Sequence, residues 1–185
     1  MCSGGIEIKR MKMVQFVTIG GILTALTVMF QSSPVFLPAI GLTLSPFSTM
    51  PIAIAAVLSI YLGAAVLLSS TLILIIMSPQ EALILLFTTG LLGTILGLLL
   101  YRKGRFLSII VCAVTLTLGM LVLTYIVAVP GFVEIAGSLS LPLIILTFFL
   151  FSLIYVSIWK IFLRKFVELL IRIKVIEKPV HGTNK

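Results

Sequence analysis

The chain has 185 residues, of which 61% are hydrophobic and 10% charged, and it contains no aspartate. Its mean hydropathy is +1.33. A soluble domain carries about a quarter charged residues, so this composition excludes a soluble enzyme, a disordered segment and a disulfide scaffold, and it indicates an integral membrane protein. The formal net charge is +8. In a membrane protein this charge is explained by orientation and by anionic lipid, so we expect the lipid bilayer and no nucleic acid as a partner.

The basic residues fall in three clusters, Lys9 to Lys12, Arg102 to Arg105, and Lys160 to Lys185. Short cytoplasmic loops retain Lys and Arg, so all three clusters are expected on the cytoplasmic side of the membrane. Each of the two stretches between the clusters must then cross the bilayer an even number of times. Both termini are predicted to be cytoplasmic.

A helix crosses the bilayer with about 20 apolar residues, and the turn residues divide the chain into six such spans. The predicted spans are 14–31, 35–44, 52–77, 82–101, 106–129 and 141–159. The fold class is therefore an all-α, six-helix polytopic bundle, with a cytoplasmic tail at 1–13, one transmembrane domain at 14–159 and an amphipathic cytoplasmic tail at 160–185.

The second span is short, and we expect it to be a crossing bounded by proline in the bundle interior, where irregular backbone is tolerated. A re-entrant segment would break the even count of crossings. The sequence SPFSTMP at 45–51 contains two prolines and is predicted to be the turn between the second and third spans.

Few residue types that carry chemistry are present. The single histidine, His181, lies in the terminal tail, and Cys2 and Cys112 are predicted in different compartments of the topology, so no disulfide is expected. We expect no catalytic set, no metal and no cofactor, and the protein is not predicted to be an enzyme. The first apolar run is longer than a signal-peptide core and is expected to be retained.

Polar residues gather toward the predicted outer side of the bundle. They could line a cavity open to the outside, where two carboxylates favour a cationic or hydrogen-bonding solute, or they could be ordinary loop residues. Both interpretations stay open. The candidate substrate-binding residues are Gln31, Ser32, Ser33, Gln80, Glu81, Tyr125 and Glu134.

Small residues recur at helical spacing in two spans. Gly93 and Gly97 form a G-x-x-x-G in the fourth span, and Gly21 and Ala25 have the same spacing in the first. Such positions let helix backbones approach closely. They serve either packing within the bundle or docking of a partner helix.

The segment after the sixth span, KIFLRKFVELLIRIKVIEK, is amphipathic. The charged residues Lys160, Arg164, Glu168 and Arg172 recur every four positions, and Glu168 followed by Arg172 has the favourable order for an ion pair along a helix. The predicted apolar face carries Phe162, Phe166, Leu169, Leu170 and Ile173. We expect this segment to extend the sixth span and then to lie along the inner leaflet.

Three segments together, GGILTALTVMF, SPFSTMP and FTTGLLGTILGLLLYRKGR, resemble the YybS-like family of small bacterial membrane proteins, over about residues 17–129. That family is in turn similar to the substrate-capture S-components of energy-coupling factor (ECF) transporters. The resemblance implies a multi-pass protein of the bacterial cytoplasmic membrane that binds a vitamin or related solute near the outer face. It also implies docking onto a transmembrane coupling subunit driven by ATPases, through Gly21 and Ala25, where S-components usually have two alanines.

Two functions are therefore expected from the sequence. The first is an S-component-like subunit of a solute or vitamin uptake transporter, energised by a partner because no ionisable residue lies near the middle of a predicted span. The alternative is a membrane scaffold or regulatory subunit that assembles with other membrane proteins and transports nothing.

Overall fold

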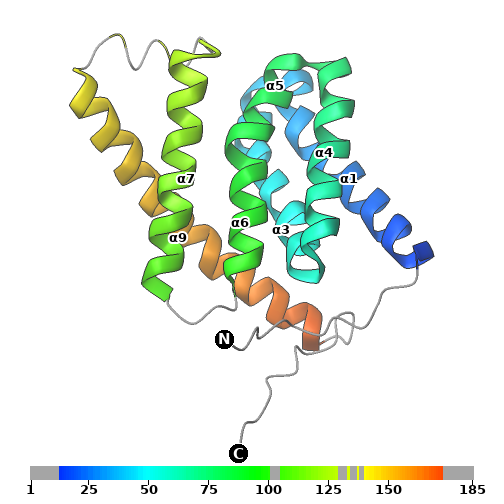
Figure 1. The fold of residues 1–185 in the computed structure, drawn as a ribbon. Helices are drawn as coiled ribbons and strands as arrows, with labels where there is room; N and C mark the ends of the chain where they lie inside the picture. The colour runs from blue at the N-terminus through cyan, green and yellow to red at the C-terminus, as the bar shows by residue number, and fades with distance from the viewer. Residues whose placement is uncertain (1–12, 101–104, 129–132, 134–136, 138–139, 173–185) are drawn as a thin grey trace, which may run out of the picture.

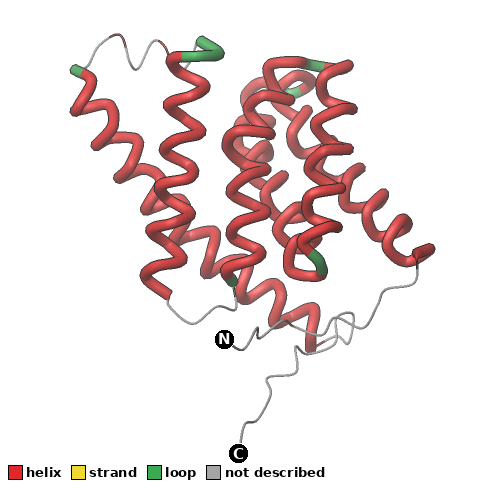
Figure 2. Tube along the Cα trace, in the orientation of Figure 1, coloured by secondary structure: helices red, strands yellow, loops and turns green. Residues whose placement is uncertain are grey.

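The structure is a computed structural model that describes residues 13–100, 105–128, 133, 137 and 140–172. The described chain is helical, with short connections and no strand (Figure 1, Figure 2). Five helical stretches of the described chain are long and apolar enough to cross a membrane: Met13–Phe36, Ile60–Met77, Pro79–Leu99, Phe106–Tyr125 and Leu141–Leu169. Pro79–Leu99 includes a π-helical turn, and Ser45–Leu58 is a shorter apolar helix. The prediction of an all-α protein with several helices long and apolar enough to span a membrane is confirmed.

From Met13 to Leu99 the helices follow one another with few intervening residues, and two more described helices follow towards the C-terminus. They are α1 (Met13–Phe36), α2 (Pro38–Leu44), the 3₁₀ turn η1 (Ser45–Ser48), α3 (Thr49–Leu58), α4 (Ile60–Met77), α5 (Pro79–Ile84), the π-helix η2 (Leu85–Gly90), α6 (Leu91–Leu99), α7 (Arg105–Tyr125) and α9 (Leu141–Arg172).

The segment SPFSTMP is not the turn that the sequence predicted. It forms η1 and the first turn of α3, so that α2, η1 and α3 follow one another as a broken helix. Pro46 lies in the first turn of its element, where the missing N–H is unpaired in any helix. Proline here starts a helix instead of ending one, and the predicted boundary between the second and third spans is wrong.

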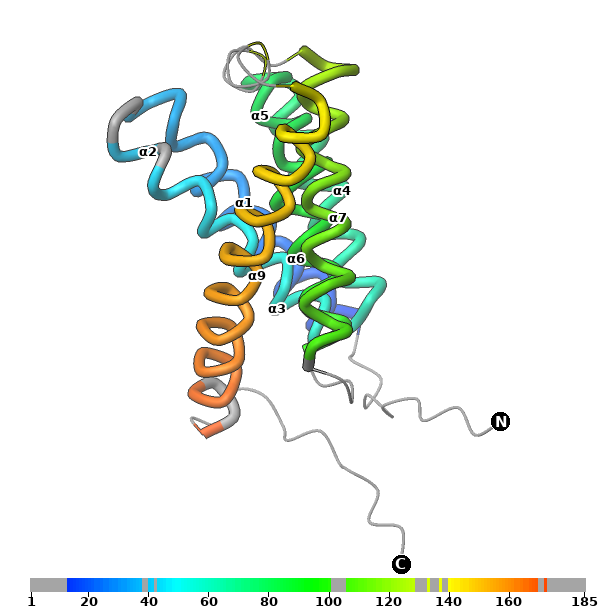
Figure 3. Tube along the Cα trace, turned by 90° about the vertical axis from the view of Figure 1, so that its left-hand side faces the viewer, coloured from blue at the N-terminus to red at the C-terminus, as the bar shows by residue number. Residues whose placement is uncertain are grey.

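The chain reverses instead at Ser59, which has an extended backbone (φ −161°, ψ 137°) between α3 and α4. The two helices pack closely against each other, and the absence of a side chain at Gly63 permits this: a Cβ there would lie only 2.8 Å from Ala56. The predicted third span, 52–77, is therefore two helices. The predicted second span is also misplaced: α2 stands at the edge of the molecule beside α1 (Figure 3), with Ile40 60% exposed, instead of in the interior.

Helix α3 forms the centre of the molecule, although it is too short to cross a bilayer alone. Ile52 and Ala55 are completely buried in it, and the two hydrophobic clusters of the core meet on its surfaces. Gly93 and Gly97 of α6 face α3, where a Cβ on Gly97 would lie 2.5 Å from the carbonyl oxygen of Ala53. In this protein the G-x-x-x-G brings two helices of the same chain into backbone contact.

Helix α9 continues without a break from Leu141 to Arg172, so the amphipathic segment does extend the last span. Leu163 and Val167 of this segment are fully buried inside the molecule, whereas Phe162 and Leu169 of the predicted apolar face are 43% and 50% exposed. The predicted pair of Glu168 with Arg172 is replaced by an exposed ion pair of Glu168 with Arg164, 3.0 Å between Oε1 and Nε.

Candidate functional site

A buried polar cluster joins four elements of the bundle. Gln31 of α1 is fully buried, and its Nε2 donates a hydrogen bond to Oε2 of Glu81 in α5 at 2.8 Å. Its Oε1 accepts hydrogen bonds from Ser48 of η1 at 2.7 Å and from Thr89 of η2 at 3.3 Å. One amide side chain thus connects a carboxylate and two hydroxyls that are far apart in the sequence. We call these four residues the Gln31 cluster.

Local structure explains how the members of the cluster reach Gln31. Glu81 lies in the first turn of α5, a short helix that begins at Pro79, and a carboxylate there interacts favourably with the helix N-terminus. Ser48 ends the 3₁₀ turn that replaces the predicted loop. Both positions follow from the prolines that start these elements.

Thr89 lies in the π-helix η2, whose wider turn differs from the α-helix on either side of it. Single π turns occur mostly inside α-helices and often at functional sites. Helix α7 packs against this segment through Gly119, where a Cβ would overlap the carbonyl oxygen of Phe87. The absence of a side chain at Gly119 therefore lets α7 close against the π turn.

The cluster satisfies polar groups that would otherwise be costly in an apolar bundle. A buried amide without a hydrogen-bond partner lowers the stability of the fold by about 1 to 3 kcal/mol, and a buried carboxylate by more. Ionisable residues inside membrane segments are rare and usually mark a functional pathway. The pairing of Gln31 with Glu81 therefore has both a structural and a functional interpretation.

The structure brings together two of the seven predicted solute-binding residues, Gln31 and Glu81. The hydroxyls of Ser32 and Ser33 instead donate to the carbonyl of Met29 within α1, at 3.4 and 2.9 Å. Gln80 is exposed, and Tyr125 is 54% exposed at the end of α7. Glu134 lies outside the described residues.

Sequence reasoning missed Ser48 and Thr89. Ser48 lies in the segment predicted to be a turn, and Thr89 directly precedes the glycines of the fourth span. The only indication in the sequence is that each is a hydroxyl residue within an apolar run. Other hydroxyl residues in apolar runs bond a carbonyl of their own helix, as Thr27 does with the carbonyl of Leu23 at 2.8 Å, so this pattern does not identify a site.

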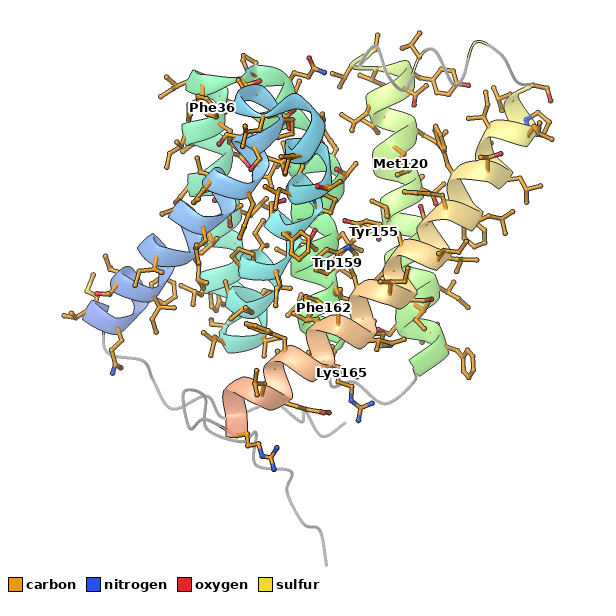
Figure 4. All side chains as sticks on the ribbon, turned by 180° about the vertical axis from the view of Figure 1, so that it is seen from behind. Phe36, Met120, Tyr155, Trp159, Phe162 and Lys165 are labelled. Atoms are coloured by element: carbon orange, nitrogen blue, oxygen red, sulfur yellow. The ribbon has the colours of Figure 1, made fainter. Side chains whose placement is uncertain are left out.

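A cavity of about 270 Å³ lies between η1 and α9, and its lining includes none of the four residues of the Gln31 cluster. Its labelled residues Tyr155, Trp159 and Phe162 follow one another along α9 (Figure 4). It is apolar and aromatic, and none of the predicted solute-binding residues lines it. Its lining residues are Phe47, Tyr155, Ile158, Trp159 and Phe162.

The small residues of α1 differ from those of α6 in their surroundings. Gly21 and Ala25 are exposed, and a Cβ on Gly21 would have no atom within 4 Å. Gly20, by contrast, faces Leu62 of α4, whose Cδ1 would lie 3.3 Å from such a Cβ. The face of α1 that carries Gly21 and Ala25 is therefore uncovered by the described part of the chain.

Among the described residues there is no group of three or more His, Cys, Asp or Glu side chains that could hold a metal ion. A scan against protein-family models, a search of curated proteins and a search of solved structures each found no match to this chain.

Proposed function

We propose that the protein is an S-component-like membrane subunit that captures a small solute at the outer side of the bacterial cytoplasmic membrane and depends on a partner for energy. The observation that carries the proposal is the hydrogen bond from buried Gln31 to Glu81, which holds a carboxylate at one end of the bundle. The resemblance to S-components supports solute capture as the class of function.

The proposal includes six crossings with both termini cytoplasmic. The broken helix α2, η1 and α3 supplies the sixth crossing beside the five long helices. The start of α1, the start of α7 and the end of α9, which adjoin the three basic clusters, lie at one end of the bundle, and α5 lies at the other (Figure 1). By the positive-inside rule the basic end is cytoplasmic, and Glu81 is then on the outer side.

At this position the Gln31 cluster suits a solute that donates hydrogen bonds or carries a positive charge. Glu81 is only partly buried, and its carboxylate can exchange the Gln31 amide for a donor on the solute. Ser48 and Thr89 then stabilise the released amide of Gln31 through its Oε1. The exchange takes the acceptor away from Nε2 of Gln31, so every buried polar group stays paired only when the solute also accepts a hydrogen bond from this amide.

The test is to purify the tagged protein in mild detergent, extract small molecules and quantify them by mass spectrometry. We expect a molecule that co-purifies with the wild type and is lost from Glu81→Gln, which keeps an acceptor for Gln31 but removes the charge. Glu168→Gln is the matched control, because it makes the same change at an exposed site. Equal recovery from all three proteins would refute solute capture at Glu81.

Coupling to a partner is proposed to use the uncovered face of α1. Gly21→Leu and Ala25→Leu should abolish co-purification of a transmembrane coupling subunit and its ATPases. Ala64→Leu, at another exposed alanine in α4, should leave it intact. A partner that is retained by the α1 variants would place the docking surface elsewhere.

The same uncovered face favours the second candidate, a scaffold or regulatory subunit that transports nothing. In that case the α1 variants disrupt a complex while Glu81→Gln changes neither bound solute nor partner. The two experiments together separate the candidates, because only the transport function requires the carboxylate.

A further inference from the structure

The aromatic cavity and the basic end of α9 lie on one face of the helix. The spacing of Tyr155, Trp159, Phe162 and Lys165 is three or four residues, so these side chains follow one another along one stripe of α9 (Figure 4). A second hollow, of about 310 Å³, continues this stripe beyond the cavity. It is lined by Lys165, Glu168, Leu169 and Arg172.

Three rings make the apolar cavity a preformed site. Phe47 and Trp159 meet edge to face, with centroids 5.4 Å apart, Trp159 and Phe162 do so at 5.5 Å, and Phe47 and Phe162 at 6.3 Å. Each ring is therefore held by the other two in the geometry that aromatic pairs prefer. Trp159 is 8% exposed, whereas Phe162 and Ile158 are 43% and 61% exposed, so the cavity opens to the outside of the bundle.

The polar hollow has an excess of positive charge. Glu168 is paired with Arg164, on the neighbouring side of the helix. Lys165 and Arg172 contribute two cations to the hollow itself, about 10 Å apart along the axis at 1.5 Å per residue. Two cations beside an apolar cavity match an amphiphile with an acyl chain and an anionic headgroup.

We propose that this stripe of α9 is a binding site for an anionic phospholipid, with one acyl chain in the cavity of Phe47, Trp159 and Phe162 and the phosphate between Lys165 and Arg172. The five apolar helices imply a bilayer around the molecule, so acyl chains are the surroundings of an outward-facing cavity. The cavity volume, about 270 Å³, is slightly below the range of sites for complete small molecules and suits part of a chain. Basic hollows on the cytoplasmic side of membrane proteins are where anionic headgroups bind.

Trp159 provides a direct test, because it is the single tryptophan of the chain and lies in the cavity. The full-length protein is reconstituted in phosphatidylcholine vesicles that contain a minor fraction of either phosphatidylglycerol or phosphatidylcholine with brominated acyl chains. Bromine quenches tryptophan fluorescence only at close contact. We expect brominated phosphatidylglycerol to quench Trp159 at several-fold lower mole fraction than brominated phosphatidylcholine.

The variants separate a specific site from general surface charge. Each cation near an anionic headgroup is worth roughly a fivefold preference, so the double variant Lys165→Gln/Arg172→Gln should lose most of the preference for phosphatidylglycerol. The double variant Arg102→Gln/Lys103→Gln removes the same charge from the predicted cytoplasmic loop and should keep it. Circular dichroism confirms that each variant has the helicity of the wild type.

Three results would overturn the proposal. Equal quenching by the two brominated lipids in the wild type excludes headgroup selection. An equal loss of preference in both double variants assigns the effect to net charge. Absence of quenching by either lipid shows that something other than an acyl chain, such as a second copy or a partner helix, covers the cavity.

Discussion

Gln31→Leu tests whether the Gln31 cluster holds the bundle together. Leucine is similar in volume but removes the donor to Glu81 and the acceptor for Ser48 and Thr89. The variant therefore removes the side-chain hydrogen bonds from Gln31 to three other elements while leaving the apolar packing of α1 nearly unchanged.

The expected loss follows from the geometry of the three hydrogen bonds. Two are short, at 2.7 and 2.8 Å, and the third, at 3.3 Å, is long and contributes little. Hydrogen bonds between membrane helices average about 0.6 kcal/mol and reach about 1.7 kcal/mol, and one of the short bonds accepts at a carboxylate, which strengthens it. The free energy of unfolding should fall by about 2 kcal/mol.

The assay is reversible unfolding in mixed micelles, in which circular dichroism follows helicity as the fraction of dodecyl sulfate increases. Gln80→Leu is the control, because Gln80 is an exposed neighbour of Glu81 and should change stability by less than about 0.5 kcal/mol. If Gln31→Leu is as stable as the control, the cluster does not stabilise the fold. A double-mutant cycle with Ser48→Ala should give a coupling energy near that of one short hydrogen bond.

The remaining predictions concern packing and surface charge, and the same unfolding assay measures them. Gly119→Ala and Gly97→Ala each place a Cβ against a backbone carbonyl of a neighbouring element and should lose about 1 to 3 kcal/mol. Gly21→Ala, which meets no atom, should equal or exceed the wild type by up to about 1 kcal/mol, because alanine favours helix; a loss there would show that this face is covered. Arg164→Gln breaks the exposed pair with Glu168 and should cost less than about 0.5 kcal/mol, with a smaller effect at high salt; a larger cost would show that the pair is not solvated.

The two pairs of small residues show what the sequence could predict about helix packing and what it could not. The spacing of Gly93 and Gly97 identifies a face for close approach, but the same spacing occurs at Gly21 and Ala25, and the sequence left both packing and docking open for each. The structure gives them different surroundings: α3 lies against the α6 pair, and the described chain leaves the α1 pair uncovered. The difference arises from neighbours that come from other segments of the chain.

The sequence by itself indicated the structural class of the molecule, an all-α protein with several apolar helices. An excess of apolar residues with few charges is typical of a multi-pass membrane protein, and a bilayer favours helices, since each backbone polar group is then paired within its own segment. The continuation of the last helix beyond Trp159 was also predictable, because no proline or glycine follows Trp159 until beyond Arg172.

Only the tertiary structure decided where the chain reverses and which polar groups meet. A proline can either start or end a helix, and the packing of neighbouring elements selects between the two. SPFSTMP therefore forms η1 and the beginning of α3. The chain reverses at Ser59 instead, where Ala56 and Gly63 pack closely. Gln31 bonds residues 17, 50 and 58 positions away. Local periodicity carries no information about residues so far apart, because their contacts form only when the helices pack. These hydrogen bonds form because a buried amide in an apolar bundle has few other polar groups to bond.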